Sequence, residues 1–287
     1  METSELIKKV RKIEIKTRGL TNHIFAGEYH SAFKGRGMAF SEVREYQYGD
    51  DIRNIDWNVT ARFNHPYIKI FEEERELTVM LVIDVSGSRD FGTSLRLKKN
   101  LIAELSAILA FSAIKNNDKI GAILFTDQVE KFIPPKKGRQ HILRLIRELI
   151  EFEPQNKGTN VAEGLRYLTN VIKKRSIAFV ISDFMSPDFE ESLKIVNRKH
   201  DVVGLRIYDR REAEIPSMGL VQLKDAETRA LIWADTSNRK VRENYAQWWN
   251  NRQTALRDIF IRNGVDHVSI RTDEDYVKPL INLFKQR

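Results

Sequence analysis

From residue 76 onward, short and continuously apolar segments alternate with segments of helical periodicity, and this alternation constrains the fold more than any other feature. The segment 76–84, ELTVMLVID, is rich in Val, Leu and Ile, which is typical of a strand buried on both faces. It is followed by apolar residues at helical spacing, among them Leu97, Leu101 and Leu105. Further strands are predicted at 119–125, 176–184, 201–209 and 265–272, and further helices at 138–150, 160–174, 188–199, up to Asn263, and at 275–286.

Strands that alternate with helices predict an α/β fold, with a doubly wound and mostly parallel sheet of the Rossmann type covered on both faces. Segment 129–135 ends in two prolines and is expected to be an edge or hairpin strand. Segments 219–225 and 229–235 are expected to form a hairpin. In such a sheet, ligands bind beyond the carboxyl ends of the strands, so functional residues are expected there.

The first 75 residues differ from the rest of the chain. Residues 19–75 are rich in Gly, Arg, Asp and aromatic side chains, and a strand is predicted only near 67–74. We expect an irregular, loop-rich N-terminal subdomain preceded by an amphipathic helix at 4–17. The predicted organisation is therefore an N-terminal segment, 1–75, followed by the sheet domain, 76–287.

Composition excludes several classes of protein. The chain has no cysteine, which rules out disulfides and thiolate zinc sites and favours a reducing compartment. The longest mainly apolar run, Leu105–Ile114, is half the length of a membrane span, and the N-terminus does not resemble a signal peptide. We therefore expect a cytoplasmic protein without a transmembrane segment.

The net charge of +8 has two interpretations. Residues 1–75 contain 13 Lys and Arg against 12 Asp and Glu, so the basic excess belongs to the later part of the chain, including segment 136–147. Such patches are either solvated helix faces or a surface for nucleic acid.

Polar side chains follow the first buried strand directly, in the sequence LVIDVSGSRDFG at 81–92. Asp84, Ser86 and Ser88 would converge on one point if they lie in a turn at the strand end. A carboxylate and two hydroxyls are hard oxygen donors that suit Mg²⁺ or Mn²⁺. The same residues also occur as ordinary turn or helix-capping residues, so this segment alone leaves both interpretations open.

Two more segments bring oxygen donors to the same edge of the predicted sheet. Thr159 lies before a helix and behind Gly158, and Asp183 ends the strand FVISDF. Taken singly, each residue also suits a cap or a turn. Taken with the first segment, they provide two acids and three hydroxyls at the ends of neighbouring elements.

The motifs DVSGS, GTN and ISDF, in this order, resemble the metal-ion-dependent adhesion site of von Willebrand factor A domains over roughly residues 76–287. This resemblance implies a von Willebrand factor A-like fold. It also implies that Ser86, Ser88 and Thr159 coordinate Mg²⁺, while Asp84 and Asp183 hold the ion largely through water.

Residues 35–75 narrow the family further. The segment GRGMAFSEVREYQYGDDIRNIDWNVTARFNHPYIKIFEEER resembles the signature of the bacterial family catalogued as domain of unknown function fifty-eight. Genes of that family often lie beside genes for MoxR-type AAA+ ATPases, which implies such an ATPase as a partner. Longer members carry membrane helices ahead of the signature, and we expect none here.

The signature also permits an interpretation from its residue types. We expect carboxylate–guanidinium pairs among its Asp and Arg side chains, and we expect Trp57 and Phe63 to anchor the segment in the core. The segment would then either hold an irregular loop together or provide a docking surface for a partner.

Enzyme motifs are missing from the sequence. A haloacid-dehalogenase-type phosphatase needs a second acid at the position of Ser86, and neither a Gly-x-Ser-x-Gly elbow nor a P-loop is present. We therefore expect a non-enzymatic, metal-dependent protein-interaction module without a small-molecule substrate. Its partner would present an acidic loop to the metal and to Arg89. The alternative is a nucleic-acid-binding protein that uses the basic surface.

Overall fold

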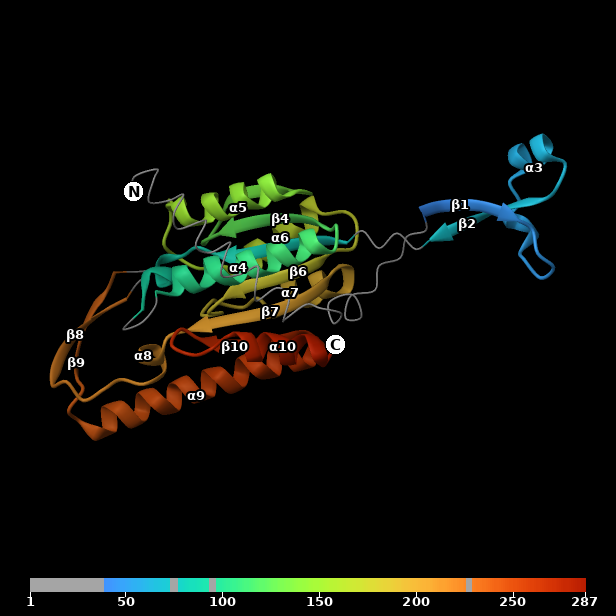
Figure 1. Ribbon diagram of the computed structural model, residues 1–287. Helices are drawn as coiled ribbons and strands as arrows, with labels where there is room; N and C mark the ends of the chain where they lie inside the picture. The colour runs from blue at the N-terminus through green and yellow to red at the C-terminus, as the bar shows by residue number, and fades with distance from the viewer. Residues whose placement is uncertain (1–38, 73–76, 93–96, 226–228) are drawn as a thin grey trace. The chain divides into compact units, whose positions relative to one another are not determined.

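The computed structural model describes residues 39–72, 77–92, 97–225 and 229–287 (Figure 1). These residues belong to two compact units, one bounded by Phe33–Leu77 and the other comprising Thr78–Arg287. We call them the signature unit and the sheet unit and describe each by itself. The helix expected at 4–17 lies outside the described residues.

The signature unit is more regular than the sequence suggested. Its strands β1 (Ala39–Glu45) and β2 (Tyr67–Glu72) pair in antiparallel fashion, and between them lie the 3₁₀ helix η1 (Ile52–Asn54) and helix α3 (Trp57–Phe63). The strand predicted near 67 is confirmed, whereas β1 and α3 were not predicted. Helix α3 has only seven residues, so its hydrophobic periodicity is too short to read. Its start depends on Asp56, whose carboxylate accepts hydrogen bonds from the amides of Asn58 and Val59.

The predicted ion pairs of the signature unit form in part. Arg44 pairs with Asp50 through two hydrogen bonds of 2.9 and 2.8 Å, and Arg53 pairs with Asp51. The third acid, Asp56, lies 3.5 Å from the ammonium of Lys69 rather than beside an arginine.

The expectation that two aromatic side chains of this unit anchor it in the core is wrong. Trp57 is 71% exposed and Phe63 is 61% exposed. Both belong to a helix so short that one face cannot bury both rings, because residues six apart point in different directions around a helix.

The sheet unit has a central six-stranded sheet with the order β10-β7-β6-β3-β4-β5. All neighbouring pairs are parallel except β4 and β5. This is the order of a doubly wound sheet, so the predicted fold class is confirmed. The strands are β3 (Thr78–Asp84), β4 (Lys119–Phe125), β5 (Val129–Lys136), β6 (Ile177–Ser182), β7 (Asp201–Tyr208) and β10 (Asp266–Arg271).

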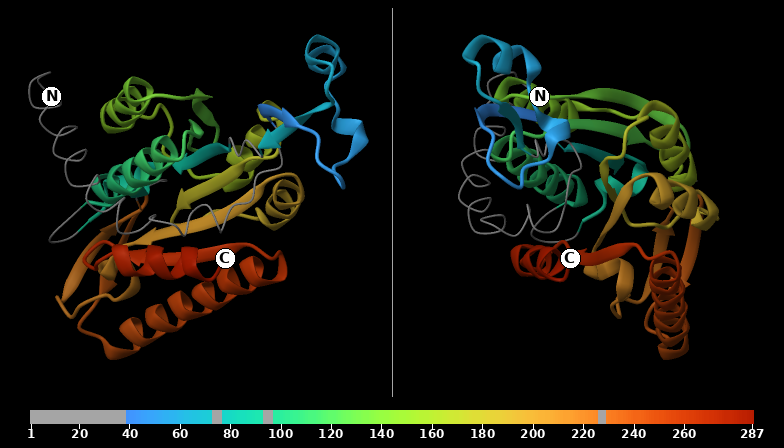
Figure 2. Two further views of the ribbon diagram at one scale, coloured as in Figure 1. Left: turned by 45° about the vertical axis from the view of Figure 1, so that its right-hand side comes forward. Right: turned by 90° about the vertical axis from the view of Figure 1, so that its right-hand side faces the viewer.

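Helices cover both faces of this sheet (Figure 2). One face is packed by α6, α7 and α9, and the other by α4 and α10, with α5 beside α4. The helices are α4 (Lys98–Lys115), α5 (Arg139–Glu151), α6 (Val161–Val171), α7 (Glu190–Lys199), α9 (Arg239–Arg262) and α10 (Val277–Lys285). All were predicted, apart from shifts at their ends.

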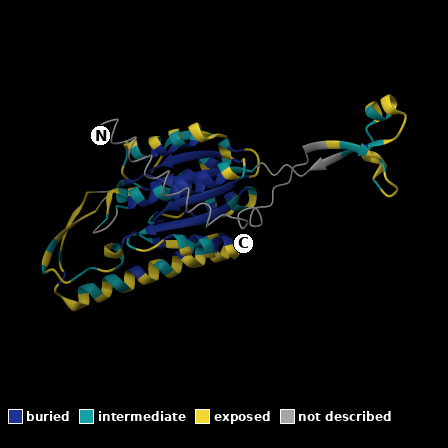
Figure 3. Ribbon diagram, viewed as in Figure 1, coloured by how far each residue is buried: buried dark blue, intermediate teal, exposed yellow. Residues whose placement is uncertain are grey.

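The core is centred on β3, as expected for a strand with a continuously apolar sequence (Figure 3). Gly121 in β4 permits the close approach of edge strand β5, because a Cβ there would lie 2.7 Å from the carbonyl oxygen of Ile133. At roughly 25 cal/mol per Å² of apolar surface, burial of these strands dominates the stability of the unit.

An insertion between β7 and α9 carries the predicted hairpin. The one-turn helix α8 (Arg210–Ala213) precedes β8 (Leu220–Lys224), which pairs antiparallel with β9 (Leu231–Asp235). In Figure 1 this hairpin lies toward the same side as the arrowheads of β6 and β7, which is the carboxyl edge of the sheet.

Candidate metal centre

The carboxyl edge of the sheet brings together residues from β3 and β6. Asp84 is the last residue of β3, and Ser86 and Ser88 follow it, Ser88 within the 3₁₀ helix η2 (Gly87–Asp90). Asp183 follows the last residue of β6. Because β3 and β6 are parallel neighbours, the residues that follow their ends meet at one place.

Hydrogen bonds hold the first segment in a defined turn. The Asp84 carboxylate accepts from the Ser86 amide at 2.9 Å and from the Ser182 hydroxyl at 2.6 Å. The hydroxyl oxygens of Ser86 and Ser88 lie 3.2 Å apart. Two hydroxyls and a carboxylate therefore face one small region, as the spacing D-x-S-x-S predicts.

Thr159 is buried in the loop that enters α6. Its neighbours tie this loop to the carboxyl edge: the Lys157 carbonyl accepts from the Gly87 amide at 2.9 Å, and the Asn160 amide donates to the Thr126 carbonyl at 2.9 Å. The structure thus places Thr159 at the predicted edge, in a loop that contacts the serine turn. Thr159 is not among the residues that line the small cavity described below.

The loop after β6 adopts an uncommon backbone. Phe184, directly after Asp183, has φ 57°, a left-handed conformation that costs energy for a bulky residue. Its ring packs edge-on against Phe260 at 5.1 Å, and its amide donates to the Ser182 hydroxyl at 2.9 Å. These contacts hold the strained turn, in which the amide of Met185 donates to the Asp183 carboxylate.

The two aspartates differ in their electrostatic state. Burial, and then the charge of Asp183, raise the pKa of Asp84 to about 6. Burial acts in the same direction on Asp183, but the positive charge of Lys98 and hydrogen bonds to the carboxylate outweigh it, so the pKa of Asp183 is lowered. The negative charge of Asp84 is therefore disfavoured in the site, whereas the negative charge of Asp183 is stabilised by Lys98.

The compensating residue, Lys98, was not identified from the sequence. It begins α4 and is only 2% exposed, and its ammonium lies 2.9 Å from Asp183 and 2.5 Å from Glu212 of α8. The available signal was its spacing, because Lys98 precedes Leu101, Ile102 and Leu105 on the buried face of the helix. Glu212 had no such signal, since it comes from an insertion far along the chain.

A small cavity lies within this cluster and tests whether a cation fits. Its volume is about 10 Å³, near the lower limit for one water molecule. It is lined by Asp84, Ser88, Arg89, Lys98, Ile102, Ser182, Asp183 and Ile207. Its possible metal ligands are the carboxylates of Asp84 and Asp183 and the hydroxyls of Ser88 and Ser182, and these oxygens suit a small, hard divalent ion. The ammonium of Lys98 and the guanidinium of Arg89 line the same cavity and oppose such an ion.

Arg89 connects this cavity to a larger surface cleft of about 770 Å³. The cleft also contains residues of the α5–α6 loop, such as Lys157, and Lys224 and Arg229 of the hairpin. One Arg89 nitrogen donates to the Phe152 carbonyl, and its ε-nitrogen lacks a hydrogen-bond partner among the described residues. The guanidinium is therefore held beside the site, and part of its hydrogen-bonding capacity is unused within the described residues.

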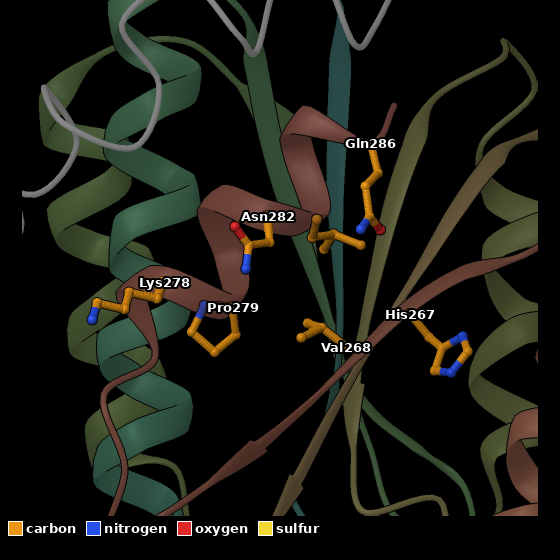
Figure 4. Close-up of a pocket in the computed structure, with 7 residues that line it drawn as sticks. His267, Val268, Lys278, Pro279, Asn282 and Gln286 are labelled. Carbon is orange, nitrogen blue, oxygen red and sulfur yellow. The ribbon is translucent and has the colours of Figure 1, made fainter.

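A second hollow, of about 330 Å³, lies between β10 and α10 (Figure 4). Its titratable side chains do not converge: in Figure 4, His267 and Lys278 point away from each other. The His267 ring instead stacks on Phe260 at 4.7 Å. This hollow lacks the facing polar groups that a binding site needs.

Across residues 39–72, 77–92, 97–225 and 229–287, none of the helices combines the length and the hydrophobicity needed to cross a bilayer.

The chain matches a known protein family. The model of the family described as "Protein of unknown function DUF58" matches residues 42–255. The uncharacterized protein Rv1480 of Mycobacterium tuberculosis (strain ATCC 25618 / H37Rv) is 27% identical over 290 residues, which span 100% of this chain and 91% of that protein.

Solved structures show similarity in fold. An aerotolerance-related membrane protein from Bacteroides fragilis is 15% identical, with a TM-score of 0.51 over 74% of this chain and 100% of that chain. The von Willebrand A domain of SpRpn10 is 12% identical, with a TM-score of 0.40 over 74% of this chain and 95% of that chain. Only the first similarity is strong enough to support the fold assignment.

Proposed function

The chain belongs to the DUF58 family, and from this premise we propose that it is a non-enzymatic, metal-dependent protein-interaction module of the cytoplasm. The observation that carries the proposal is the convergence of Asp84, Ser88 and Asp183 on a cavity of about 10 Å³ at the carboxyl edge of the sheet, with the Ser86 hydroxyl 3.2 Å from that of Ser88. The absence of cysteine fits a reducing compartment.

In this proposal the site holds Mg²⁺ or Mn²⁺. Ser86, Ser88 and Thr159 provide hydroxyl ligands, and Asp84 and Asp183 hold the ion largely through water. An octahedral ion takes about six ligands, so protein oxygens leave room for an outside ligand. The bound ion supplies the positive charge that attracts this ligand.

The outside ligand is a carboxylate on an acidic loop of a partner protein, and Arg89 adds a second attraction for that loop. The partner is a MoxR-type AAA+ ATPase or its client, in the assembly or maturation of a protein complex. The exposed aromatic side chains of the signature unit, including Trp57 and Phe63, suit a further protein contact.

Metal binding is tested by titrating Mn²⁺ into the wild-type protein and into Asp84→Ala. We expect the variant to lose Mn²⁺ binding, while its circular dichroism stays that of the wild type. Asp90→Ala, at an exposed acid only six residues away, is the matched control and should bind Mn²⁺ like the wild type. Unchanged Mn²⁺ affinity in Asp84→Ala would refute the metal assignment.

Partner capture is tested by pull-down from host lysate with MgCl₂ or with EDTA. The double variant Ser86→Ala, Ser88→Ala and the charge reversal Arg89→Glu should both lose the captured protein. Capture that persists in EDTA but disappears at high salt would favour the nucleic-acid alternative, because such binding depends on counterion release.

A further inference from the structure

Lys98 is a buried cation placed directly at the candidate metal centre. Its ammonium contacts Asp183 at 2.9 Å and Glu212 at 2.5 Å, and its side chain is 2% exposed. Two carboxylates within ion-pair distance favour the charged form of a buried ammonium. The lysine therefore remains charged inside the fold.

The position of this ammonium is defined by three separate elements. Lys98 itself begins α4, and its amide donates to the Phe91 carbonyl at 3.0 Å. Asp183 is held in the strained loop after β6, and Glu212 closes a capping box with Asp209 in α8. The carboxylate of Asp209 in turn accepts from Thr272 at 2.6 Å. Such anchoring distinguishes Lys98 from a surface lysine that moves freely.

The ion pair between Lys98 and Asp183 reduces the negative charge that the site offers to a metal ion. The serine and threonine hydroxyls are neutral, so the charge that balances a divalent ion must come from the two aspartates. Asp183 is already paired with an ammonium, whereas Asp84 has no ion pair among the described residues and shares the cavity with the guanidinium of Arg89. Like charges repel strongly where water is excluded, so the ammonium and a metal ion oppose each other.

We propose that Lys98 sets the metal affinity of this site: by neutralising Asp183 it keeps binding of a divalent ion weak until a carboxylate from outside completes the charge. The inference rests on the metal site of the proposed function and adds a positioning residue to it. Metal binding and capture of an acidic partner then depend on each other, because each supplies the charge that the other lacks.

The experiment measures Mn²⁺ affinity alone, by calorimetry and by the electron paramagnetic resonance signal of free Mn²⁺, in the full-length protein. Lys98→Met removes the opposing charge and should bind Mn²⁺ about tenfold or more tightly than the wild type. Glu212→Gln leaves the lysine paired with Asp183 alone and should bind Mn²⁺ a few-fold more weakly. Lys99→Met is the matched control, since this neighbour pairs with Asp90 at the surface and its affinity should stay within about twofold.

Opposite shifts in Lys98→Met and Glu212→Gln support the inference, because a merely structural role would weaken binding in both. Unchanged or weaker affinity in Lys98→Met overturns it while leaving the proposed metal site intact. If Lys98→Met does not fold, unchanged or tighter binding in Glu212→Gln still overturns the inference. Absence of Mn²⁺ binding at 10 mM in the wild type and both variants would instead refute the metal site itself, and the inference with it.

Discussion

The two units of this chain place their ion pairs in opposite surroundings. In the sheet unit, Lys98 and Asp183 are 2% and 5% exposed, whereas in the signature unit Arg53 and Asp51 are 85% and 44% exposed. Exposed pairs contribute little to stability, while a buried pair becomes costly as soon as one partner is removed. The comparison teaches that similar pairs lie in different settings: one is buried at the candidate metal centre, and the other lies in an exposed surface turn.

Apolar side chains follow the same division. The strand β3 is buried along nearly its whole length, while Tyr48, Ile52, Trp57 and Phe63 of the signature unit are exposed. A large hydrophobic core stabilises the sheet unit, so its site can contain strain and buried charge. The signature unit instead presents its aromatic rings to the surroundings, which is typical of a contact surface.

The largest expected effect comes from the core of the sheet unit. Phe179→Ala removes a fully buried ring of β6 that packs against Phe284 at 6.2 Å, and it should lower the free energy of unfolding by about 3–5 kcal/mol. Urea unfolding followed by circular dichroism measures this loss. Trp57→Ala removes an aromatic side chain at an exposed site and should change the free energy of unfolding by less than about 0.5 kcal/mol. Similar losses in the two variants would contradict the division between the units.

Breaking the buried ion pairs of Lys98 should likewise cost more stability than breaking the exposed pair of Arg53 and Asp51. Lys98→Met leaves Asp183 and Glu212 as buried, unpaired acids and should cost about 3 kcal/mol in metal-free protein. Arg53→Met, in the exposed pair, should leave the melting temperature unchanged. Differential scanning calorimetry in EDTA makes the comparison, and a stable Lys98→Met protein would show that its carboxylates find other partners.

A buried histidine should make the sheet unit sensitive to acid. His200 is fully buried, its Nδ1 lies 2.9 Å from the Ser176 hydroxyl, and burial lowers its pKa from 6.5 to about 4. Because the unfolded chain takes up this proton first, stability is complete above about pH 6.5 and is lost as the pH falls toward 4. The loss should be about 3 kcal/mol.

The measurement for this prediction is the free energy of unfolding between pH 7 and pH 4. His200→Gln should flatten this limb of the curve, whereas His65→Gln, at an exposed position of the signature unit, controls for the removal of a histidine. An unchanged slope in His200→Gln would assign the acid sensitivity to other groups.

The smallest effect is expected at the cap of α3. Asp56→Ala removes the acceptor for the amides of Asn58 and Val59, and hydrogen exchange of these amides should accelerate about fivefold. Asp56→Asn keeps a capping acceptor and should exchange nearly as the wild type does. Equal acceleration in both variants would point to the charge contact with Lys69 instead of the cap.

The local sequence was sufficient to predict most elements of the sheet unit and part of the candidate metal centre. The apolar run 76–84 predicted a central strand, and D-x-S-x-S predicted that Asp84, Ser86 and Ser88 share a turn. Both predictions succeed because a strand buried on two faces and a tight turn depend on neighbours in the chain.

Ser186 shows the limit of local signals. A serine shortly before a helix is typical of an N-cap, but Phe189 occupies that position at α7, and the Ser186 hydroxyl accepts from the Val161 amide at the start of α6.

Within the signature unit, sequence alone identified β2 and two of the ion pairs but not β1 or α3. Short elements lack a readable period, and their formation depends on strand pairing and on the cap at Asp56.

Sequence by itself thus determined the α/β class, the central strand and the acids and hydroxyls at its end, because hydrophobic periodicity and residue chemistry are local properties. Tertiary structure alone decided which charges meet there. Lys98 reaches Asp183 and Glu212 from positions 85 and 114 residues earlier in the chain, and only the packing of α4 and α8 at the sheet edge brings them within 3 Å. The physical reason is that a buried ammonium is stable only beside carboxylates, and their placement depends on the whole fold.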